Sequence, residues 1–187
     1  MPRDATWSNK DGLVVGFGTH SVDNSCPAVT GTGTSRQLQM VIDLTEVPDT
    51  ASATNGIAYP QAPIIPRGSV ITRATITTLE AATSTGAATL DLGLWTRGKA
   101  TDVVDDADGI VSGVTIAEMT TVGEIHLCDG ALLPLATGAS TLVGATGLGD
   151  CVVTAEYATA AYTAGKIIVR VEYEVPFGEA GRSFAAV

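Results

Sequence analysis

The hydrophobic pattern along the chain is that of short β-strands. Residues 36–44 (RQLQMVIDL) alternate between apolar and mostly polar side chains, which predicts a half-buried strand. Its apolar positions are Leu38, Met40, Ile42 and Leu44. The clearest alternation lies near the C-terminus, with Ile167, Val169, Val171, Tyr173 and Val175 on one face and Ile168, Arg170, Glu172 and Glu174 on the other. Each segment therefore predicts a strand with one buried face.

Two hairpins are predicted from turn residues that separate strand-like runs. Residues 149–176 form two such runs, with a turn expected near Ala164 and Gly165. Residues 70–80 are mostly β-branched, which suits a pleated surface and disfavours helix. Residues 83–96 follow after a glycine-containing turn and place three leucines on one face. The segments 70–80 and 83–96 thus predict a long hairpin.

One short helix is predicted within residues 112–124. Thr115 stands at the N-cap position, Glu118 completes a capping box three residues later, and Gly123 can end the helix. Residues 45–66 contain four prolines and are expected to form a loop. Short strands, Gly and Pro turns and one small helix together predict an all-β fold, an antiparallel β-sandwich or jelly roll.

The chain divides into an arm, one domain and a tail. Residues 1–35 are rich in Gly, Asn, Ser, Thr and Asp and contain one apolar island, GLVVGFG at residues 12–18. We expect an extended N-terminal arm at 1–35, a β-sandwich domain at 36–176 and a C-terminal tail at 177–187. A chain of 187 residues is long enough for one substantial core.

The charge balance limits the classes of partner. Twenty acidic and ten basic residues give a net charge of −10, which repels phosphate backbones and anionic lipid surfaces. We therefore expect neither nucleic acid nor a membrane as a partner. The N-terminus lacks the apolar segment of a signal peptide, and no stretch has the roughly 18 to 20 apolar residues that a bilayer span needs. Synthesis in a reducing cytoplasm is the expectation.

Residues able to carry chemistry are few and scattered. His20 and His126 lie far apart, and no GxSxG or HExxH motif is present. Cys26, Cys128 and Cys151 lack a CxxC spacing, which indicates buried free thiols, with a Cys128–Cys151 disulfide as the alternative if their strands adjoin. We expect no catalytic residues, no cofactor and no metal.

An acidic run at residues 102–109 (DVVDDADG) is similar to a calcium loop but does not fit one. With Gly109 at the sixth loop position, Asp106 and Asp108 fit the ligand pattern. Val104 then occupies the first ligand position, and Thr115 stands where a bidentate Glu is required. We expect a solvent-exposed acidic loop at Asp102 to Asp108, with a looser cation site as the alternative.

Residues 65–79 (IPRGSVITRATITTL) present small, uncharged side chains where a free monomer needs charge. Charged residues make up only 16% of the chain, and uncharged strand faces invite association. This pattern predicts a symmetric contact with another subunit through Thr72, Ala74 and Ile76. Cover by a second sheet of the same sandwich is the alternative.

Two segments carry a resemblance to a known group of proteins. IPRGSVITRATITTLEAATSTGAATLDLGLW (residues 65–95) and YATAAYTAGKIIVRVEYEVP (residues 157–176) resemble virion structural proteins of tailed bacteriophages, in particular head decoration or capsid cement proteins. The resemblance implies a β-sandwich that binds the outside of a capsid as a trimer or similar ring, without enzymatic activity. It also implies the major capsid protein as a partner and the virion surface as the location.

The arm supplies a possible mode of attachment. Leu13, Val14, Val15 and Phe17 are expected to add a strand to an open sheet edge of a neighbouring subunit or of the shell protein, with Phe17 filling a pocket.

Three alternatives to a capsid decoration protein remain open. A tail or fibre subunit would differ only in its location on the particle. A carbohydrate-binding sandwich would use the aromatic residues Trp7, Trp95, Tyr157, Tyr162 and Tyr173. A hydrolase would use paired Asp and Glu residues.

Overall fold

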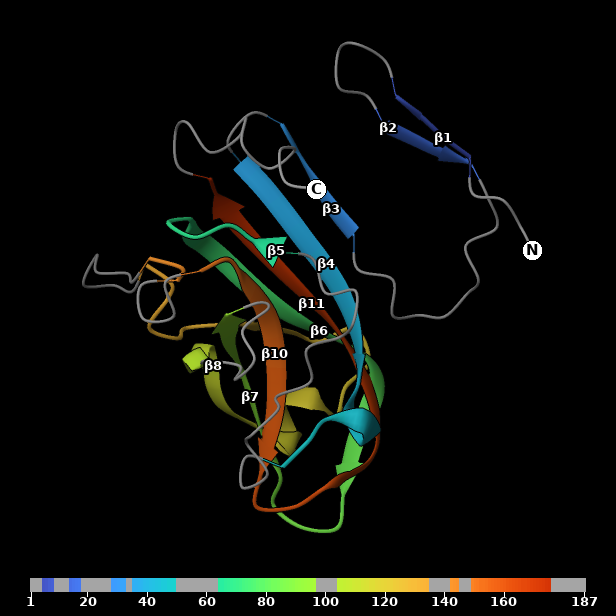
Figure 1. Ribbon diagram of the computed structural model, residues 1–187. Coiled ribbons are helices and arrows are strands. Elements are labelled where there is room, and N and C mark those ends of the chain that lie inside the picture. Colours follow the sequence, from blue (N-terminus) through green and yellow to red (C-terminus); the bar gives the residue numbers. More distant parts are fainter. Residues whose placement is uncertain are drawn as a thin grey trace.

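The chain forms two antiparallel β-sheets that pack face to face, as the computed structural model in Figure 1 shows. The structure describes residues 5–8, 14–17, 28–32, 35–49, 64–96, 104–134, 142–144 and 149–175. The prediction of an all-β antiparallel sandwich is confirmed. One large apolar core fills the space between the sheets and receives side chains from both.

The larger sheet has five strands in the order β3, β4, β11, β6 and β9. Their bounds are Ala28–Thr32 for β3, Ser35–Asp43 for β4, Tyr162–Glu174 for β11, Val70–Ser84 for β6 and Ile125–Leu127 for β9. The buried faces predicted for β4 and β11 are confirmed. The buried positions are Leu38, Met40 and Ile42 in β4 and Ile167, Val169, Val171 and Tyr173 in β11, followed by Val175.

The smaller sheet has four strands in the order β5, β10, β7 and β8. Their bounds are Ile64–Ile65 for β5, Cys151–Ala158 for β10, Thr89–Thr96 for β7 and Val104–Thr115 for β8. Leu90, Leu92 and Leu94 of β7 are fully buried against the larger sheet, as their alternation predicted. β8, which contains most of the acidic run, is a strand from Val104 onward and not the predicted loop.

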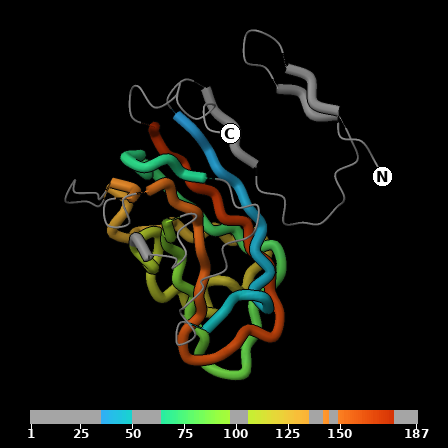
Figure 2. The backbone as a smooth tube through the Cα atoms, viewed as in Figure 1, coloured from blue at the N-terminus to red at the C-terminus, as the bar shows by residue number. Residues whose placement is uncertain are grey.

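Both predicted hairpins are wrong, because their strands lie in different sheets. β6 pairs with β11 and β9, whereas β7 pairs with β10 and β8. Likewise, the chain leaves β10 and crosses to β11 at residues 159–161, where Thr159 has a φ of 74°, while Gly165 lies inside β11. The two crossings lie together at one end of the sandwich (Figure 2), where the hydroxyls of Thr83 and Thr163 are 2.8 Å apart.

Two bulges in β6 change which of its residues face the core. The register with β11 shifts between Glu172 and Tyr173 and again between Lys166 and Ile167, so Thr72 and Leu79 are extra residues. Thr72 and Arg73 are both exposed for this reason, as are Leu79 and Glu80. The core face is Ile71, Ala74, Ile76 and Thr78, which differs from the strict alternation predicted for this strand.

The predicted helix is reduced to one 3-10 turn. β8 continues to Thr115, and the turn η3 covers only Ile116–Met119. The capping box is nevertheless present, since the backbone amide and the hydroxyl of Thr115 both donate to Oε2 of Glu118 at 2.8 Å. A second 3-10 turn, η1 (Leu44–Glu46), follows β4.

The N-terminal region contains three strands. β1 (Ala5–Ser8) and β2 (Val14–Phe17) pair with each other and form a separate two-stranded sheet. β3 pairs with β4 between the positions Ala28↔Gln39 and Thr32↔Ser35. The predicted boundary between residues 35 and 36 therefore falls at the start of β4, and part of the predicted arm, β3, belongs to the larger sheet. Residues 50–63 of the proline-rich loop and the tail at 177–187 lie outside the described residues.

Candidate interaction surface at the β9 edge

Two of the residues predicted to bind a partner lie inside the protein. Ala74 and Ile76 are each 1% exposed and belong to the core, because the smaller sheet of the same chain covers them. The predicted partner contact at Ala74 and Ile76 is therefore wrong, and the alternative of cover by a second sheet is correct. Thr72 is exposed at its bulge, where its hydroxyl donates to the backbone carbonyl of Glu172 at 3.2 Å.

The arm residues predicted to bind a partner fall in or beside β2. Val14, Val15 and Phe17 belong to this strand, which pairs with β1 through positions such as Trp7↔Val15 and Ala5↔Phe17. Leu13 lies outside the described residues. The backbone of this segment thus has the extended form that strand addition needs, and its binding role remains a prediction.

The outer face of the larger sheet carries charged and polar rows and one mainly apolar row. Its cross-strand rows are Gln37, Glu172 and Arg73; Gln39, Arg170, Thr75 and Leu127; Val41, Ile168, Thr77 and Ile125; and Asp43, Lys166 and Glu80. Lys166 Nζ lies 3.7 Å from Asp43 Oδ2 and 4.0 Å from Glu80 Oε2. The expectation of an uncharged outer face on β6 is therefore wrong, because β6 and its neighbour β11 place charged side chains there.

Apolar side chains are exposed at one edge of this face. Ile125 and Leu127 of β9 are 63% and 60% exposed, and Val122 in the preceding loop is 64% exposed. Leu79, at the second bulge of β6, is also exposed beside this loop, which is joined to β6 by a bond from the Gly123 amide to the Thr78 carbonyl (2.8 Å). We call Leu79, Val122, Ile125 and Leu127 the β9 patch. Exposed apolar groups that lie together in this way are typical of interaction sites.

The backbone of β9 is also open to a partner. The Thr78 amide bonds to the Glu124 carbonyl, and the Cys128 amide bonds to the Ala74 carbonyl, each at 3.0 Å. Antiparallel pairing alternates between residues that face the neighbouring strand and residues that face away. Because His126 pairs with Ile76 between these two bonds, the amides and carbonyls of Ile125 and Leu127 face away from β6. No described strand pairs with β9 on that side.

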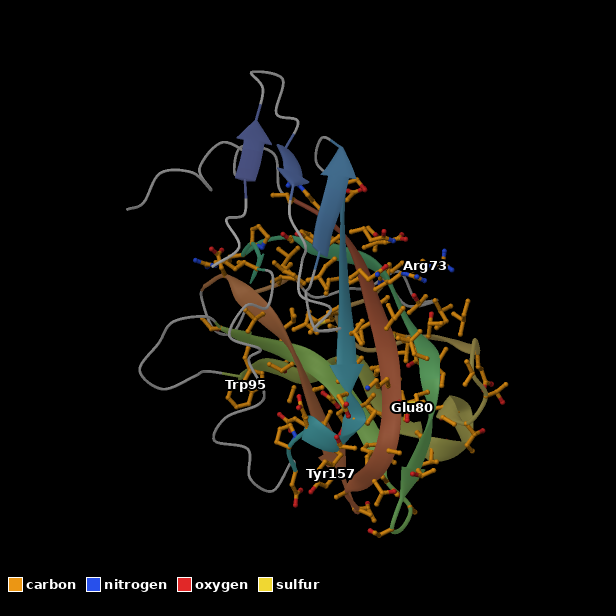
Figure 3. All side chains as sticks on the ribbon, turned by 90° about the vertical axis from the view of Figure 1, so that its right-hand side faces the viewer. Arg73, Glu80, Trp95 and Tyr157 are labelled. Carbon is orange, nitrogen blue, oxygen red and sulfur yellow. The ribbon has the colours of Figure 1, made fainter. Side chains whose placement is uncertain are left out.

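A polar pocket adjoins the β9 patch on the outer face. It has a volume of about 470 Å³ and is lined by Arg73, Arg170, Gln37, Gln39 and Glu172, with Ile125 at its β9 end. Arg170 Nε donates to Gln39 Oε1 at 2.9 Å, and Gln37 Nε2 donates to Glu172 Oε1 at 3.4 Å. Arg73 has no hydrogen bond or ion pair within the described residues, and its guanidinium points away from the sheet (Figure 3).

The smaller sheet carries charge of one sign. Its strands contain no Lys or Arg, and their acidic residues are Asp91, Asp105, Asp106, Asp108 and Glu156. Glu156 is 4% exposed, and its Oε1 has no hydrogen-bond partner. Burial, together with the negative charges of Asp91 and Asp108, raises the pKa of Glu156 above its usual range.

The structure describes two cysteines and one histidine of the chain. Cys128 and Cys151 are buried thiols that form no disulfide with each other, as predicted, and Cys151 Sγ donates to the Gly149 carbonyl at 3.5 Å. Cys26 and His20 lie outside the described part of the chain. His126 Nδ1 lies 3.5 Å from Glu118 Oε1. Within the described ranges, no three His, Cys, Asp or Glu side chains are arranged to hold a metal ion. Residue 102 and the side chain of Asp105, which belong to the acidic run, are not described.

The four aromatic residues whose side chains are described form no exposed platform. Trp95, Tyr162 and Tyr173 are buried, and the partly buried Tyr157 contacts Tyr162 edge to face with ring centroids 6.3 Å apart. The side chain of Trp7 is not described. The described aromatic side chains are therefore packing residues of this protein.

The β9 edge was missed in the sequence because it is short. Ile125, His126 and Leu127 alternate over only three residues, which is too few for a periodic pattern.

Within the described residues, no helix is long and apolar enough to cross a membrane. Searches for similar proteins found no matching family model, no matching curated protein and no matching solved structure.

Proposed function

We propose that this chain is a non-enzymatic structural protein of a bacteriophage virion, which binds and stabilises the outer surface of the capsid as a symmetric oligomer. The observation that carries the proposal is the apolar edge of β9, where Ile125 and Leu127 are exposed and their backbone groups face away from β6 toward no described strand. A chain that covers this edge would bury apolar surface and pair the free amides and carbonyls in one contact.

The capsid part of the proposal comes from the sequence resemblance of residues 65–95 and 157–176 to decoration proteins. In this scheme the β9 patch joins copies of the chain into a ring, with a trimer as the expected form. The arm, with the extended strand β2, contacts the major capsid protein. Many weak contacts repeated around a closed lattice act together through effective concentration, so no single one has to be strong.

The alternatives receive less support from the described residues. A carbohydrate platform would need exposed aromatic rings, and Trp95, Tyr162 and Tyr173 are buried. A tail or fibre subunit would use the same β9 edge and would differ only in where the ring is attached. Imaging of particles distinguishes these locations.

The test uses phage heads from a genome in which this reading frame is interrupted. Purified wild-type protein should add regular surface density to these heads in negative-stain images. The variant Ile125→Lys/Leu127→Lys should fold normally, sediment as a single protomer and fail to decorate, because two charges would be buried in the contact. Thr121→Lys, on the exposed loop before β9, is the matched control and should behave as wild type. Wild-type protein that leaves all heads bare, or that stays monomeric at micromolar concentration, would overturn the proposal.

A further inference from the structure

The basic residues of the sandwich strands all lie in one of the two sheets, which also carries the acidic residues Asp43, Glu80, Glu172 and Glu174. Every Lys and Arg within the sandwich strands belongs to the larger sheet: Arg36, Arg73, Lys166 and Arg170. The smaller sheet contains only acidic charges. Arg73 lies on the opposite side of the molecule from Trp95, which belongs to the smaller sheet (Figure 3). The two charged surfaces therefore cannot meet within one chain.

The polar pocket carries an excess of positive charge, because it contains Arg73 and Arg170 but only one carboxylate, Glu172. Glu172 accepts from Gln37, and Arg170 Nε donates to Gln39, while the terminal nitrogens of Arg170 have no partner among the described residues. A guanidinium held in this way is preorganised to bind a carboxylate through two parallel hydrogen bonds. Arg73, across the pocket, has no described partner.

The acidic cluster on the smaller sheet lacks a described cationic partner. Asp108 is exposed on the edge strand β8, and Asp91 is half-buried on β7 next to it in the sheet, where its Oδ1 accepts from the Gly113 amide at 2.6 Å. Behind them, Glu156 pairs across the strands with Asp91 and has a buried oxygen without a partner. No described Lys or Arg forms an ion pair with any of the three. A cation from outside the chain would compensate these carboxylates.

We infer, on the basis of the proposed function, that the pocket between Arg73 and Arg170 binds the acidic cluster of a second copy of this chain, with Asp108 of that copy as the main carboxylate. Charge complementarity selects this occupant, because each copy carries both halves of the contact. The contact also covers Ile125 of the β9 patch, which lines the same pocket. It is head-to-tail, because the two halves lie on opposite sheets. Repetition of a head-to-tail contact closes into a ring, such as the proposed trimer, when its rotation permits.

The test is a charge-swap cycle on the full chain, read by sedimentation velocity over a range of protein concentrations. Arg73→Glu and Asp108→Arg each remove an attraction and create a repulsion at the contact. Each should weaken self-association by roughly tenfold or more. The double variant Arg73→Glu/Asp108→Arg restores opposite charges and should return to within roughly threefold of wild type, which reveals coupling between the two sites. Both side chains are exposed and have no described hydrogen bond, so we expect the substitutions to leave the fold unchanged, which circular dichroism checks.

Two controls make the result specific. Arg67 is an exposed arginine outside the pocket, and Arg67→Glu should assemble as wild type. Wild-type assembly should weaken between about 0.05 M and 0.5 M NaCl, because salt screens exposed charges. If Arg73→Glu assembles as Arg67→Glu does, or if the double variant is merely additive, the inference is overturned. Dissociation by Ile125→Lys/Leu127→Lys with no effect of Arg73→Glu would overturn the pocket contact alone and leave the proposed function intact.

Discussion

Gly93 of β7 lies directly against the backbone of Ala107 in β8. A Cβ atom at Gly93 would overlap the carbonyl group of Ala107 and the carbonyl oxygen of Asp106. The cause is an irregular register, since β8 has three more residues than β7 between the pairs Leu92↔Val111 and Leu94↔Asp106. This extra backbone passes over β7 where only glycine leaves room for it.

Gly93→Ala should therefore destabilise the protein by about 1–3 kcal/mol or more, because backbone on both sides cannot move away from the added methyl group. Urea denaturation followed by tryptophan fluorescence measures the change in the free energy of unfolding. Ser112→Ala, at an exposed position of the same strand β8, is the control and should change stability little. Equal stability of the two variants would contradict the close approach of β8 to β7.

Ile76 and Ile125 provide a matched test of which isoleucine belongs to the core. Ile76 is buried between the sheets, whereas Ile125 is mostly exposed. Ile76→Ala should lower the free energy of unfolding by about 2–5 kcal/mol, because it removes buried methyl groups and leaves a cavity. Ile125→Ala should lower it by less than about 0.5 kcal/mol in the dissociated protein, as expected for a surface position. The reverse order would restore the interface role first predicted for Ile76.

Cys128 should be unreactive in the folded protein. Burial, with a smaller contribution from the charge of Asp129, raises the pKa of its thiol to about 12. At pH 8 this leaves roughly one thiol in 10⁴ ionised, against about one in four for an ordinary cysteine. In a Cys26→Ser background, a thiol reagent should label the native protein slowly and label both remaining cysteines after addition of guanidinium.

An added surface thiol is the control for cysteine labelling. Ser112→Cys, in the same Cys26→Ser background, places a thiol at an exposed position and should react rapidly in the native protein. Rapid native labelling of Cys128 itself, identified by peptide mass, would show that its part of the sandwich opens readily.

The sequence predicted the buried faces of the strands well and the neighbours of the strands poorly. Alternation in residues 36–44 and 166–175 identified the core side chains, because burial of one sheet face has a period of two residues. The same alternation does not indicate which strand pairs with which. Both predicted hairpins are corners between sheets, at residues 85–88 and 159–161.

The predicted site failed for a more local reason. Bulges at Thr72 and Leu79 change the face of residues that strict alternation assigns, and no residue type in β6 marks them. Ala74 and Ile76 are uncharged because they are buried in the core of the sandwich and not because they face another subunit. By contrast, the Thr115–Glu118 capping box was predicted correctly, since it depends only on residues three positions apart.

Glu156 should make the stability of the protein fall as the pH rises. Its pKa is raised in the folded state, chiefly by burial and further by Asp91 and Asp108, so the folded state binds the proton more tightly than the unfolded state. The loss of stability caused by the ionisation of Glu156 is absent below pH 4.5, the ordinary pKa of a glutamate, and grows as the pH rises above this value. Glu156→Gln removes this charge at nearly constant shape and should be more stable than wild type at pH 7.

The difference between Glu156→Gln and wild type should shrink toward zero as the pH is lowered to about 4.5. Asp43 and Glu118 act in the opposite direction, because hydrogen bonds from Thr45 and Thr115 lower the pKa of their carboxyls. Wild type and Glu156→Gln share these two residues, so their effects on stability cancel when the two proteins are compared. Glu124→Gln, on the exposed loop before β9, should show no such trend. If wild-type protein instead becomes more stable relative to Glu156→Gln as the pH rises, a cation neutralises Glu156 in the folded state.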